Sequence, residues 1–540
     1  MNDAIKNLKQ AFNEKINENG DISYRSIGSN IEDIFGMAVT YQESMRRNSS
    51  INIPVLTGSN TEKLLACYIR DPRFGQGFKK LGRYLADATG LTIEERVKSG
   101  SYKDLVEKLY EHESFKAMYK ALLGNPKAYD SNYYKDQQRK FMNDKEVIEI
   151  MDFLWKAVQD GDNLAKKWMP RFHKSGKKGE KTVSKSMILA KMFALKFNAN
   201  KSEYGKLMKT PTIESTFSQA TKENGQLATI EFGKVPSNAT LKYKARFARV
   251  YEEPDGWRDI HLAYENFISA VEKGEAKVNV GAINVVDIYK SALHNDGKDV
   301  DVIANSWLAD RTKALEGKSR SWIPITDTSS SMSCVTLSNG LTALQIGAAL
   351  SWFFAKTSTY APNTDIVFDS DTKIIQLDPN YGRGGGLIGN PQSKFSREIN
   401  SMYTGRCGST NFAKVLECLR KLDPVNYPDY FIVVSDMEFN GSGMAGRYYN
   451  SESSHAELNK TFKYWREQGI RTSMVWWNVN NRNTTNPCTS DEWGNIFISG
   501  FNPAIVDSLC DGEFIFDNKE FIQKALTSYA KKAGFEYLIG

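Results

Sequence analysis

The sequence contains few of the residues that build the common catalytic and metal sites. Its 540 residues include six cysteines, none in a CxxC pair, and five histidines, none at metal-ligand spacing. This excludes a zinc-finger spacing and a dense disulfide framework, and a reduced compartment is the simplest interpretation. The motifs GxxxxGK[ST], HExxH and GxSxG are missing too. A Ser-His-Asp hydrolase or a histidine-dependent nuclease is therefore not expected.

Long apolar runs are absent as well. No window approaches twenty unbroken apolar residues, so the sequence predicts no transmembrane helix and no membrane partner. The first 20 residues are polar and lack the apolar core of a secretory signal. We therefore expect a cytoplasmic protein.

Charge is distributed unevenly along the chain. The net charge is +7, yet residues 321–540 hold 19 lysines and arginines against 22 aspartates and glutamates, a balance of −3. The first 320 residues therefore carry +10. A polyanionic partner, if there is one, should bind this first part.

Helical periodicity dominates residues 30–317. Apolar residues recur there at three- and four-residue steps, which is typical of amphipathic helices. One such helix is predicted to end at Asp71, just before Pro72. Only the run ATIEFGKVPSN is interpreted as a short strand or extended loop. Repeated helices with short connections predict a helical-repeat domain, preceded by a polar arm over residues 1–29 that is frayed or partly helical.

From residue 318 onward, strand-like and helical segments alternate. The apolar runs WIPITD, YFIVVSD and RTSMVWWNV are predicted strands, DIVFDSDTKIIQL is a pair of strands or a hairpin, and PAIVDSLCDG is a helix. This alternation predicts, for residues 318–540, a doubly wound α/β domain with a parallel sheet covered on both faces. Ligands of such sheets bind at the carboxyl ends of the strands, where Asp327 and Asp436 are expected.

Five oxygen-bearing side chains are candidate metal ligands. Asp327, Ser329 and Ser331 follow a predicted strand with Asp-x-Ser-x-Ser spacing. Thr410 lies in a glycine-serine turn that opens a helix, and Asp436 ends another apolar run. Carboxylates and hydroxyls are hard ligands that suit Mg²⁺ or another divalent cation such as Mn²⁺.

The order of these ligands resembles the metal-ion-dependent adhesion site of von Willebrand factor type A domains. The resemblance implies one open coordination position that accepts a carboxylate from a partner protein. Glu438, two residues after Asp436, is interpreted either as a neighbour of the metal or as a residue that points into solvent.

Clusters of cations in the basic part are candidate RNA-binding residues, because clustered cations neutralise phosphates and aromatic rings stack on unpaired bases. The first cluster is Lys166, Lys167, Trp168, Arg171, His173, Lys174, Lys177, Lys178, Lys181 and Lys185, the second is Arg70, Arg73, Lys79, Lys80 and Arg83, and a weaker third is Lys242, Lys244, Arg246 and Arg249. The alternative for the first cluster is a solvated lysine loop in which Trp168 is a core anchor.

A basic helical region followed by a type A domain resembles the Ro autoantigen family of TROVE-domain proteins. The segments CYIRDPRFGQGFKKLGRYL, KWMPRFHKSGKKGEK and VVSDMEF are similar to segments of that family. The resemblance implies a ribonucleoprotein without catalytic activity, whose HEAT-like repeats close into a ring. Such a ring binds structured noncoding RNA outside and single-stranded ends of misfolded RNA in its hole. The alternative is a metal-dependent interaction or structural assembly protein that binds no RNA.

Overall fold

The computed structural model describes residues 14–16, 22–25, 56–71, 73–75, 79–172, 183–209, 230–235, 237–247, 255–281, 283–317, 319–334, 336–337, 340–382, 387–403, 408–439, 454–479, 485–486, 488, 494–500 and 518–539. The chain forms two compact units. One combines residues 1–89 with 229–540, and the other consists of residues 90–228. The second unit is thus an insertion within the sequence of the first.

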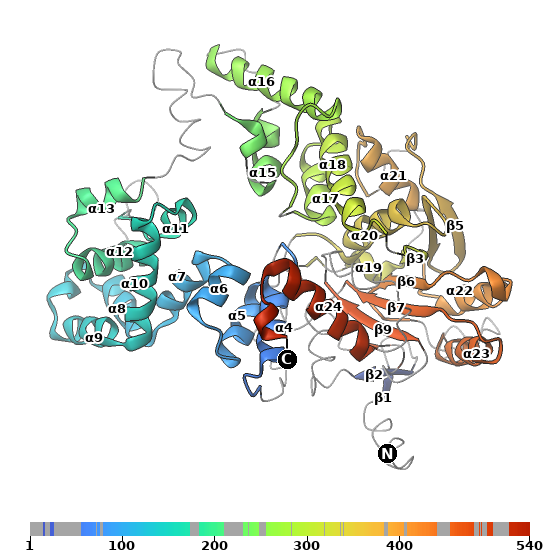
Figure 1. Cartoon of the computed structure of the whole chain (residues 1–540), viewed down its shortest axis with the longest axis horizontal. Helices are drawn as coiled ribbons and strands as arrows, with labels where there is room; N and C mark the ends of the chain where they lie inside the picture. The colour runs from blue at the N-terminus through green and yellow to red at the C-terminus, as the bar shows by residue number, and fades with distance from the viewer. Residues whose placement is uncertain are drawn as a thin grey trace. The chain divides into compact units, whose positions relative to one another are not determined.

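The described residues between 56 and 317 are helical, as the apolar spacing predicts (Figure 1). The α-helices are α4 (Asn60–Arg70), α5 (Lys79–Ala88), α6 (Ile93–Ser99), α7 (Tyr102–Glu111), α8 (Glu113–Gly124), α9 (Asn132–Asn143), α10 (Lys145–Gln159), α11 (Asn163–Trp168), α12 (Lys185–Lys196), α13 (Lys201–Leu207), α15 (Ser237–Phe247), α16 (Asp255–Glu272), α17 (Val285–His294) and α18 (Lys298–Ala314). Two short 3-10 helices, η1 (Pro126–Asp130) and η2 (Phe232–Lys234), lie between them. None of these helices is both long and apolar enough to cross a membrane.

Local sequence sets several helix boundaries. The Ser59 hydroxyl accepts from the backbone of Glu62 while the Glu62 carboxylate accepts from the backbone of Ser59, and this capping box starts α4. The same helix ends at Arg70 with Asp71 in an extended conformation, as expected for a residue that precedes a proline. The run ATIEFGKVPSN differs from expectation because it contains η2. Burial of the Phe232 ring against Phe247 overrides the weak local pattern.

The inserted unit has its own hydrophobic core. Buried side chains from α7 to α13 form one cluster that includes Leu105, Met118 and Leu189. The Trp155 ring lies parallel to the Phe197 ring, with 4.4 Å between their centroids. Burial of such side chains contributes about 1.5–3 kcal/mol each to folding, so this core stabilises the unit without a contribution from the α/β part.

A six-stranded sheet forms the centre of the first unit, in the order β5-β4-β3-β6-β7-β9. Its strands are β3 (Trp322–Asp327), β4 (Thr364–Phe368), β5 (Thr372–Gln376), β6 (Tyr430–Ser435), β7 (Ser473–Asn478) and β9 (Asn495–Ser499). All neighbouring strands are parallel except β4 and β5, which form an antiparallel hairpin. The predicted α/β fold class is confirmed, including the hairpin.

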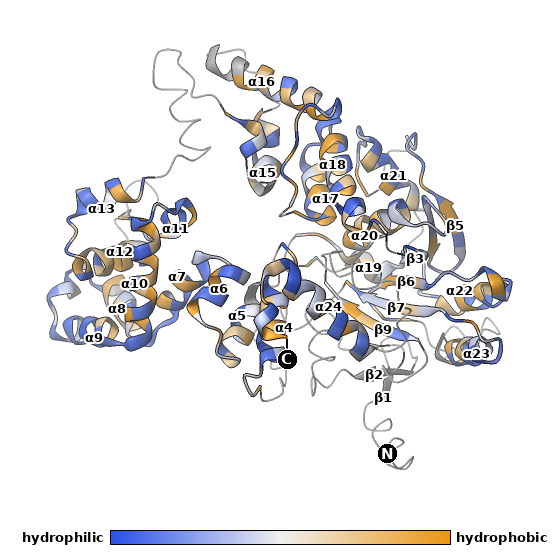
Figure 2. Cartoon of the chain, viewed as in Figure 1, coloured by the Kyte–Doolittle hydropathy of each residue, from blue (hydrophilic) through white to orange (hydrophobic). Residues whose placement is uncertain are grey.

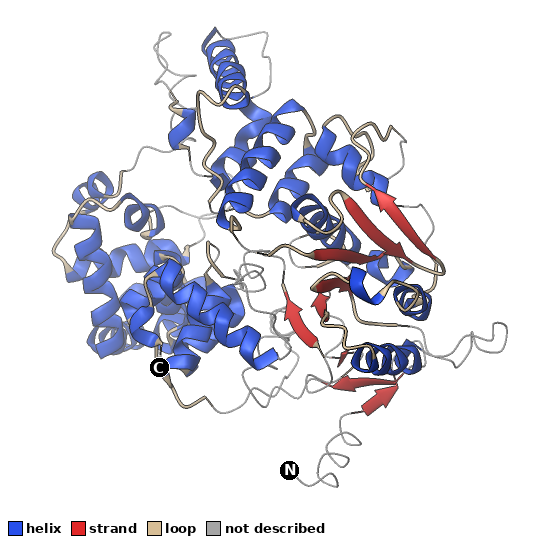
Figure 3. Ribbon diagram, turned by 45° about the vertical axis from the view of Figure 1, so that its right-hand side comes forward, coloured by secondary structure: helices blue, strands red, loops and turns tan. Residues whose placement is uncertain are grey.

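Helices cover both faces of this sheet (Figure 3). On one face, α22 (Phe412–Leu419) and α23 (Ser454–Glu467) pack on apolar side chains of the strands. On the other, α20 (Ala343–Thr357) packs on β3, and the Trp322 indole donates to the Phe354 carbonyl. Helix α20 is hydrophobic along most of its length (Figure 2). A helix buried on nearly all sides needs this composition.

Segments from both ends of the sequence join the first unit. Strands β1 (Glu14–Ile16) and β2 (Ile22–Arg25) form a small sheet with β8 (Thr485–Asn486), so the described part of the N-terminal arm is extended rather than helical. Helix α4 packs against α24 (Asn518–Ala533). There the Tyr529 hydroxyl donates to the Asp71 carboxylate at 3.2 Å. The predicted helix PAIVDSLCDG lies outside the described residues.

Two carboxylates attach the last helical segment to the α/β part. Helix α21 (Lys394–Met402) begins beside α18, and five hydrogen bonds to its first turn come to Asp296 and Asp301. Asp296 accepts from the backbone amides of Gln392 and Ser393 and from the Ser393 hydroxyl. Negative charge at a helix N-terminus is favourable because it complements the helix dipole and the unpaired amides.

Replacing this cap should destabilise the first unit. We expect Asp296→Ala to lower the free energy of unfolding by about 1–3 kcal/mol, because three donors lose a charged acceptor. Chemical denaturation measures the change. Glu316→Gln, at an exposed site just beyond α18, is the control and should stay within about 0.5 kcal/mol of the wild type. Equal stability of both variants would contradict the role of Asp296.

A second carboxyl group is buried between the sheet and α20. Both oxygens of Asp365 accept from the Thr326 hydroxyl, at 3.0 and 2.8 Å, and Thr326 also bonds Ser351 of α20. Burial raises the pKa of Asp365 well above 3.8. The folded protein therefore keeps a proton on this carboxyl at pH values where the unfolded chain has lost it.

This burial predicts a pH-dependent stability. A raised pKa in the folded state means that the free energy of unfolding falls as pH rises above 3.8, by up to about 1.4 kcal/mol per pH unit. Asp365→Asn removes that contribution, so the variant should gain on the wild type as pH rises. Denaturation at several pH values between 4 and 8 checks this. Parallel stability curves would show that Asp365 is ionised in the folded protein.

Candidate metal centre

The two predicted carboxylate ligands lie on neighbouring strands of the sheet. Strand β3 ends at Asp327, and its parallel neighbour β6 ends at Ser435, immediately before Asp436. The register pairs Thr326 with Val434, so both strands end at the same level. Parallel pairing therefore brings together two carboxylates that are more than one hundred residues apart in the sequence.

Hydrogen bonds fix the Asp327 side chain. One carboxylate oxygen accepts from the Ser329 backbone amide at 2.9 Å, and the other accepts from the Ser435 hydroxyl at 2.6 Å. Both Asp327 and Asp436 are buried. Burial, and then the negative charge of Asp436, raise the pKa of Asp327 to about 7. Two buried carboxylates that repel each other in this way form a site that a divalent cation would stabilise.

The loop after β3 directs alternate hydroxyls to opposite sides. The hydroxyls of Ser329 and Ser331 lie 3.1 Å apart. Those of Thr328 and Ser330 are instead bonded to backbone carbonyls, of Phe368 and Gly408 respectively. The Asp-x-Ser-x-Ser spacing therefore places its two serine oxygens side by side.

Thr410 lies in a loop that is tied to the same sheet edge. The Ser330 backbone amide donates to the Gly408 carbonyl at 3.2 Å, and the Asn411 amide donates to the Asp369 carbonyl at 2.9 Å. Thr410, between these two anchors, is only 3% exposed. The structure thus brings all five predicted ligands to one edge of the sheet.

The segment after Asp436 is unusual in its backbone. Met437 is buried and has a φ of 63°, a left-handed conformation that costs energy for a residue with a side chain. The next residue, Glu438, is buried and its backbone amide donates to an Asp436 oxygen at 3.3 Å. Glu438 therefore does not point into solvent, which excludes one of its two interpretations.

The donor set itself limits the choice of ion. Within the ranges that the structure describes, no three His, Cys, Asp or Glu side chains converge on one point. The candidate centre combines two carboxylates with three hydroxyls, and this all-oxygen composition fits Mg²⁺ or Mn²⁺ better than zinc.

The predicted RNA-binding residues are placed differently from one another. His173, Lys174, Lys177, Lys178 and Lys181 lie outside the described residues, and nothing is described of the side chains of Lys79 and Lys80. Arg70 is only 1% exposed, so it is not a surface cation. Arg73 is exposed, but both its carboxylate contacts go to Asp71. Arg83 is half-buried. The second cluster therefore offers little basic surface.

The first cluster has a mixed role. The Arg171 guanidinium is half-buried and donates to the carbonyls of Met208 and Lys166, which is a structural position. The half-buried Trp168 ring lies below two ammonium groups, those of Lys103 at 5.4 Å and Lys167 at 5.5 Å. The prediction that Trp168 is a core anchor is thus only partly met, since one side of its ring faces these cations.

Further lysine–aromatic pairs surround this cluster. Lys185 lies 5.4 Å from the Tyr119 ring centroid and Lys201 lies 6.0 Å from that of Phe172. Lys191 lies 3.8 Å above the Tyr129 ring. Sequence reasoning missed Lys191 and Lys201 because their aromatic partners come from other elements, so no local pattern marks them.

The third predicted group does not form a surface either. Lys244 is 1% exposed, and its ammonium group lies 3.5 Å from the Asp299 carboxylate. Lys242 is exposed beside the Tyr243 ring. The side chain of Arg246, and Arg249 as a whole, lie outside the described residues.

Comparisons with known proteins say little about function. Residues 321–534 match the family model of a domain of unknown function, DUF7788. No curated protein matches the chain. The crystal structure of the Deinococcus radiodurans Ro (RSR) protein is similar over 92% of this chain and 93% of its own, with 12% sequence identity and a TM-score of 0.33. A similarity at that level supports no functional conclusion.

Loss of one carboxylate should abolish any response to Mg²⁺. We expect Mg²⁺ at about one hundred times its Kd to stabilise the wild type by about 2.7 kcal/mol. Asp436→Asn should not respond, although without Mg²⁺ it should be at least as stable as the wild type because the repulsion with Asp327 is gone. Thermal melts and calorimetric titration measure both effects. Glu417→Gln, on the exposed side of α22, should respond like the wild type.

Proposed function

We propose that this protein is a non-catalytic RNA-binding protein whose α/β part binds a partner protein through a divalent cation. The inserted helical unit contacts structured or misfolded noncoding RNA, and the edge of the sheet recruits the partner. The two activities use separate residues, so each can be removed while the other is kept.

The lysine–aromatic pairs of α11 to α13 are the observation that carries the RNA proposal. Trp168, Phe172, Tyr119 and Tyr129 are half-buried rings, each with a lysine ammonium group within 6.0 Å of its centroid. Rings held in this way stack on unpaired bases, while the ammonium groups neutralise phosphates. The excess positive charge of the first 320 residues attracts a polyanion to the same part of the chain.

The convergence at the strand ends supports the cation proposal. Asp327 and Asp436 would supply negative charge, and Ser329, Ser331 and Thr410 would supply neutral oxygens. A bound cation would there attract the carboxylate of a partner. The chain's own contribution is to keep the two carboxylates and three hydroxyls in place through the bonds of the β3 loop and the Gly408 loop.

A second function is supported by the metal edge alone. The five candidate ligands converge regardless of whether the helical unit contacts RNA, so an interaction or assembly protein without RNA is the alternative. Absorbance at 260 against 280 nm on freshly purified protein distinguishes the two, because bound RNA raises the ratio. A nucleic-acid-free preparation that also fails to bind added RNA would favour the alternative.

Removing exposed lysines from the pairs should change how RNA binding depends on salt. We expect Lys167→Gln/Lys185→Gln/Lys201→Gln to bind a labelled stem-loop RNA with a salt slope smaller by about 2–3, since each lost phosphate contact removes about 0.7–0.9. Filter binding over a series of salt concentrations measures the slope.

A matched triple variant is the control for this experiment. Lys116, Lys140 and Lys145 are exposed lysines of the same unit whose ammonium groups lie within 4.0 Å of a carboxylate. Their replacement by glutamine should leave the slope unchanged. Equal slopes for both triple variants, or a wild type with no salt slope, would refute an RNA-binding role of these pairs.

A further inference from the structure

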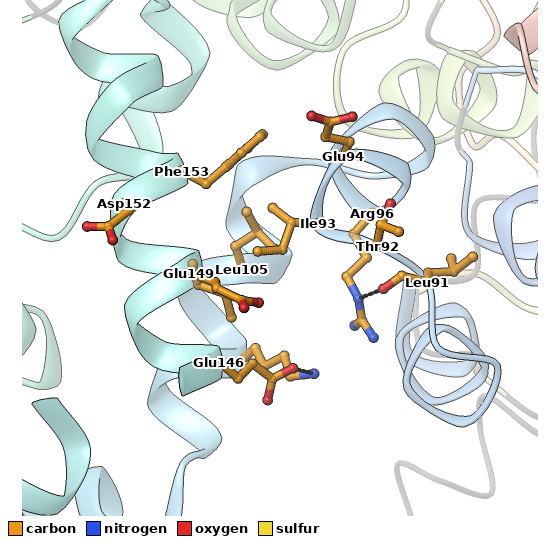
Figure 4. A pocket seen from close by; sticks show the side chains of 12 residues that line it. Leu91, Thr92, Ile93, Glu94, Arg96, Leu105, Glu146, Glu149, Asp152 and Phe153 are labelled. Atoms are coloured by element: carbon orange, nitrogen blue, oxygen red, sulfur yellow. Dashed lines mark hydrogen bonds and ion pairs between the residues drawn. The ribbon is translucent and has the colours of Figure 1, made fainter. Parts of the chain in front are cut away.

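The inserted unit contains an open hollow with acidic groups around it (Figure 4). It lies between α10 and the α6–α7 pair, and its volume is about 660 Å³. This volume falls within the range of known ligand pockets. None of the residues proposed to contact RNA or a metal lines it.

The floor of the hollow is apolar. Leu91, Leu105 and Ile150 are buried at its base, whereas Ile93 and Phe153 are half-buried and partly face the opening. The two half-buried side chains pack against the core of the unit. A ligand with an aliphatic group would cover their exposed surface, at a gain of about 25 cal/mol for each Å² removed from water.

Carboxylates surround the opening. Glu146, Glu149 and Asp152 come from successive positions along α10, and the side chain of each is more than half exposed. Glu94 stands on the opposite side, at the start of α6, and no described residue pairs with it (Figure 4). Four carboxylates thus face the hollow within a unit whose surface is otherwise rich in lysine.

The cations near these carboxylates leave acceptor oxygens available. Lys108, Lys145 and Lys196 approach Glu146, Glu149 and Asp152 at 2.5, 4.0 and 2.9 Å, and each pair involves one carboxylate oxygen. The only other cation of the lining is Arg96, which is buried and donates from Nε to the Leu91 carbonyl at 3.0 Å. Among the described residues, the hollow therefore presents acceptors above an apolar floor.

We propose that this hollow binds a short basic segment of a partner protein, in which lysines or arginines flank an aliphatic side chain. The aliphatic group fits between Ile93 and Phe153, and the flanking cations pair with Glu94 on one side and with Glu146 and Glu149 on the other. Charge complementarity excludes RNA as the occupant, because phosphates would be repelled by the same carboxylates. The inference is independent of the proposed RNA-binding function.

A labelled peptide tests this proposal on the full-length protein. The probe is a fluorescein-labelled peptide of three Lys-Leu-Lys repeats, and fluorescence anisotropy measures its binding. The chain carries a net charge of +7, so a cationic probe is repelled overall and binds only if a local site attracts it. We expect saturable binding that is weakened about tenfold in Glu146→Gln/Glu149→Gln, because two exposed ion pairs are lost.

Three controls make the result decisive. Glu113→Gln/Asp130→Asn removes the same charge elsewhere on the unit and should bind the probe like the wild type. A probe with serine in place of leucine should bind at least about tenfold more weakly, because the apolar floor is not used. Circular dichroism melts verify that each variant is folded.

Several outcomes would overturn the proposal. Equal binding to wild type and to Glu146→Gln/Glu149→Gln would place the probe elsewhere. Equal binding of the leucine and serine probes would reduce the hollow to an acidic surface. Self-association of the wild type that disappears in Glu149→Lys, without binding of the peptide, would assign the hollow to a second copy of this chain.

Discussion

Electrostatic repulsion between two buried carboxylates is the constraint on which the α/β part depends. Asp327 and Asp436 end neighbouring parallel strands, and the chain tolerates their proximity because hydrogen bonds and packing hold both strands in place. Ser435 supplies one of these bonds to Asp327. Helix α20 on one face and α22 with α23 on the other bury the strands. The repulsion is local while the packing is spread over the whole sheet, so the strand ends remain together.

The metal edge could be predicted from sequence because its geometry follows from strand topology alone. Apolar runs that stop at Asp327 and Asp436 indicate buried parallel strands, whose carboxyl ends necessarily share one edge. The Asp-x-Ser-x-Ser spacing then places Ser329 and Ser331 on one side of a turn. The left-handed conformation of Met437 could not be predicted, because a methionine carries no signal for positive φ.

Positions fixed by contacts distant in sequence could not be predicted. Arg70 reads as a basic residue beside a glycine-rich turn, but it is buried in the fold: a side chain on Gly82 would meet the Arg70 Cβ at 2.1 Å. The Asp71–Tyr529 bond joins residues 458 positions apart. Likewise, Lys103 approaches Trp168 from another helix. Periodicity identifies which residues of a helix are buried, but not which distant element covers them.

The change of sequence texture near residue 318 marks a change of secondary structure and not a break in packing. Asp296 and Asp301 belong to the helical segment, yet they cap α21 of the α/β part, and the Tyr289 hydroxyl donates to the Leu387 carbonyl across the same junction. Capping bonds of this kind satisfy buried amides that would otherwise be unpaired. Helices α17 and α18 therefore stabilise the fold that carries the candidate metal edge, whereas the inserted unit, with its own core, bears the lysine–aromatic pairs and the acidic hollow.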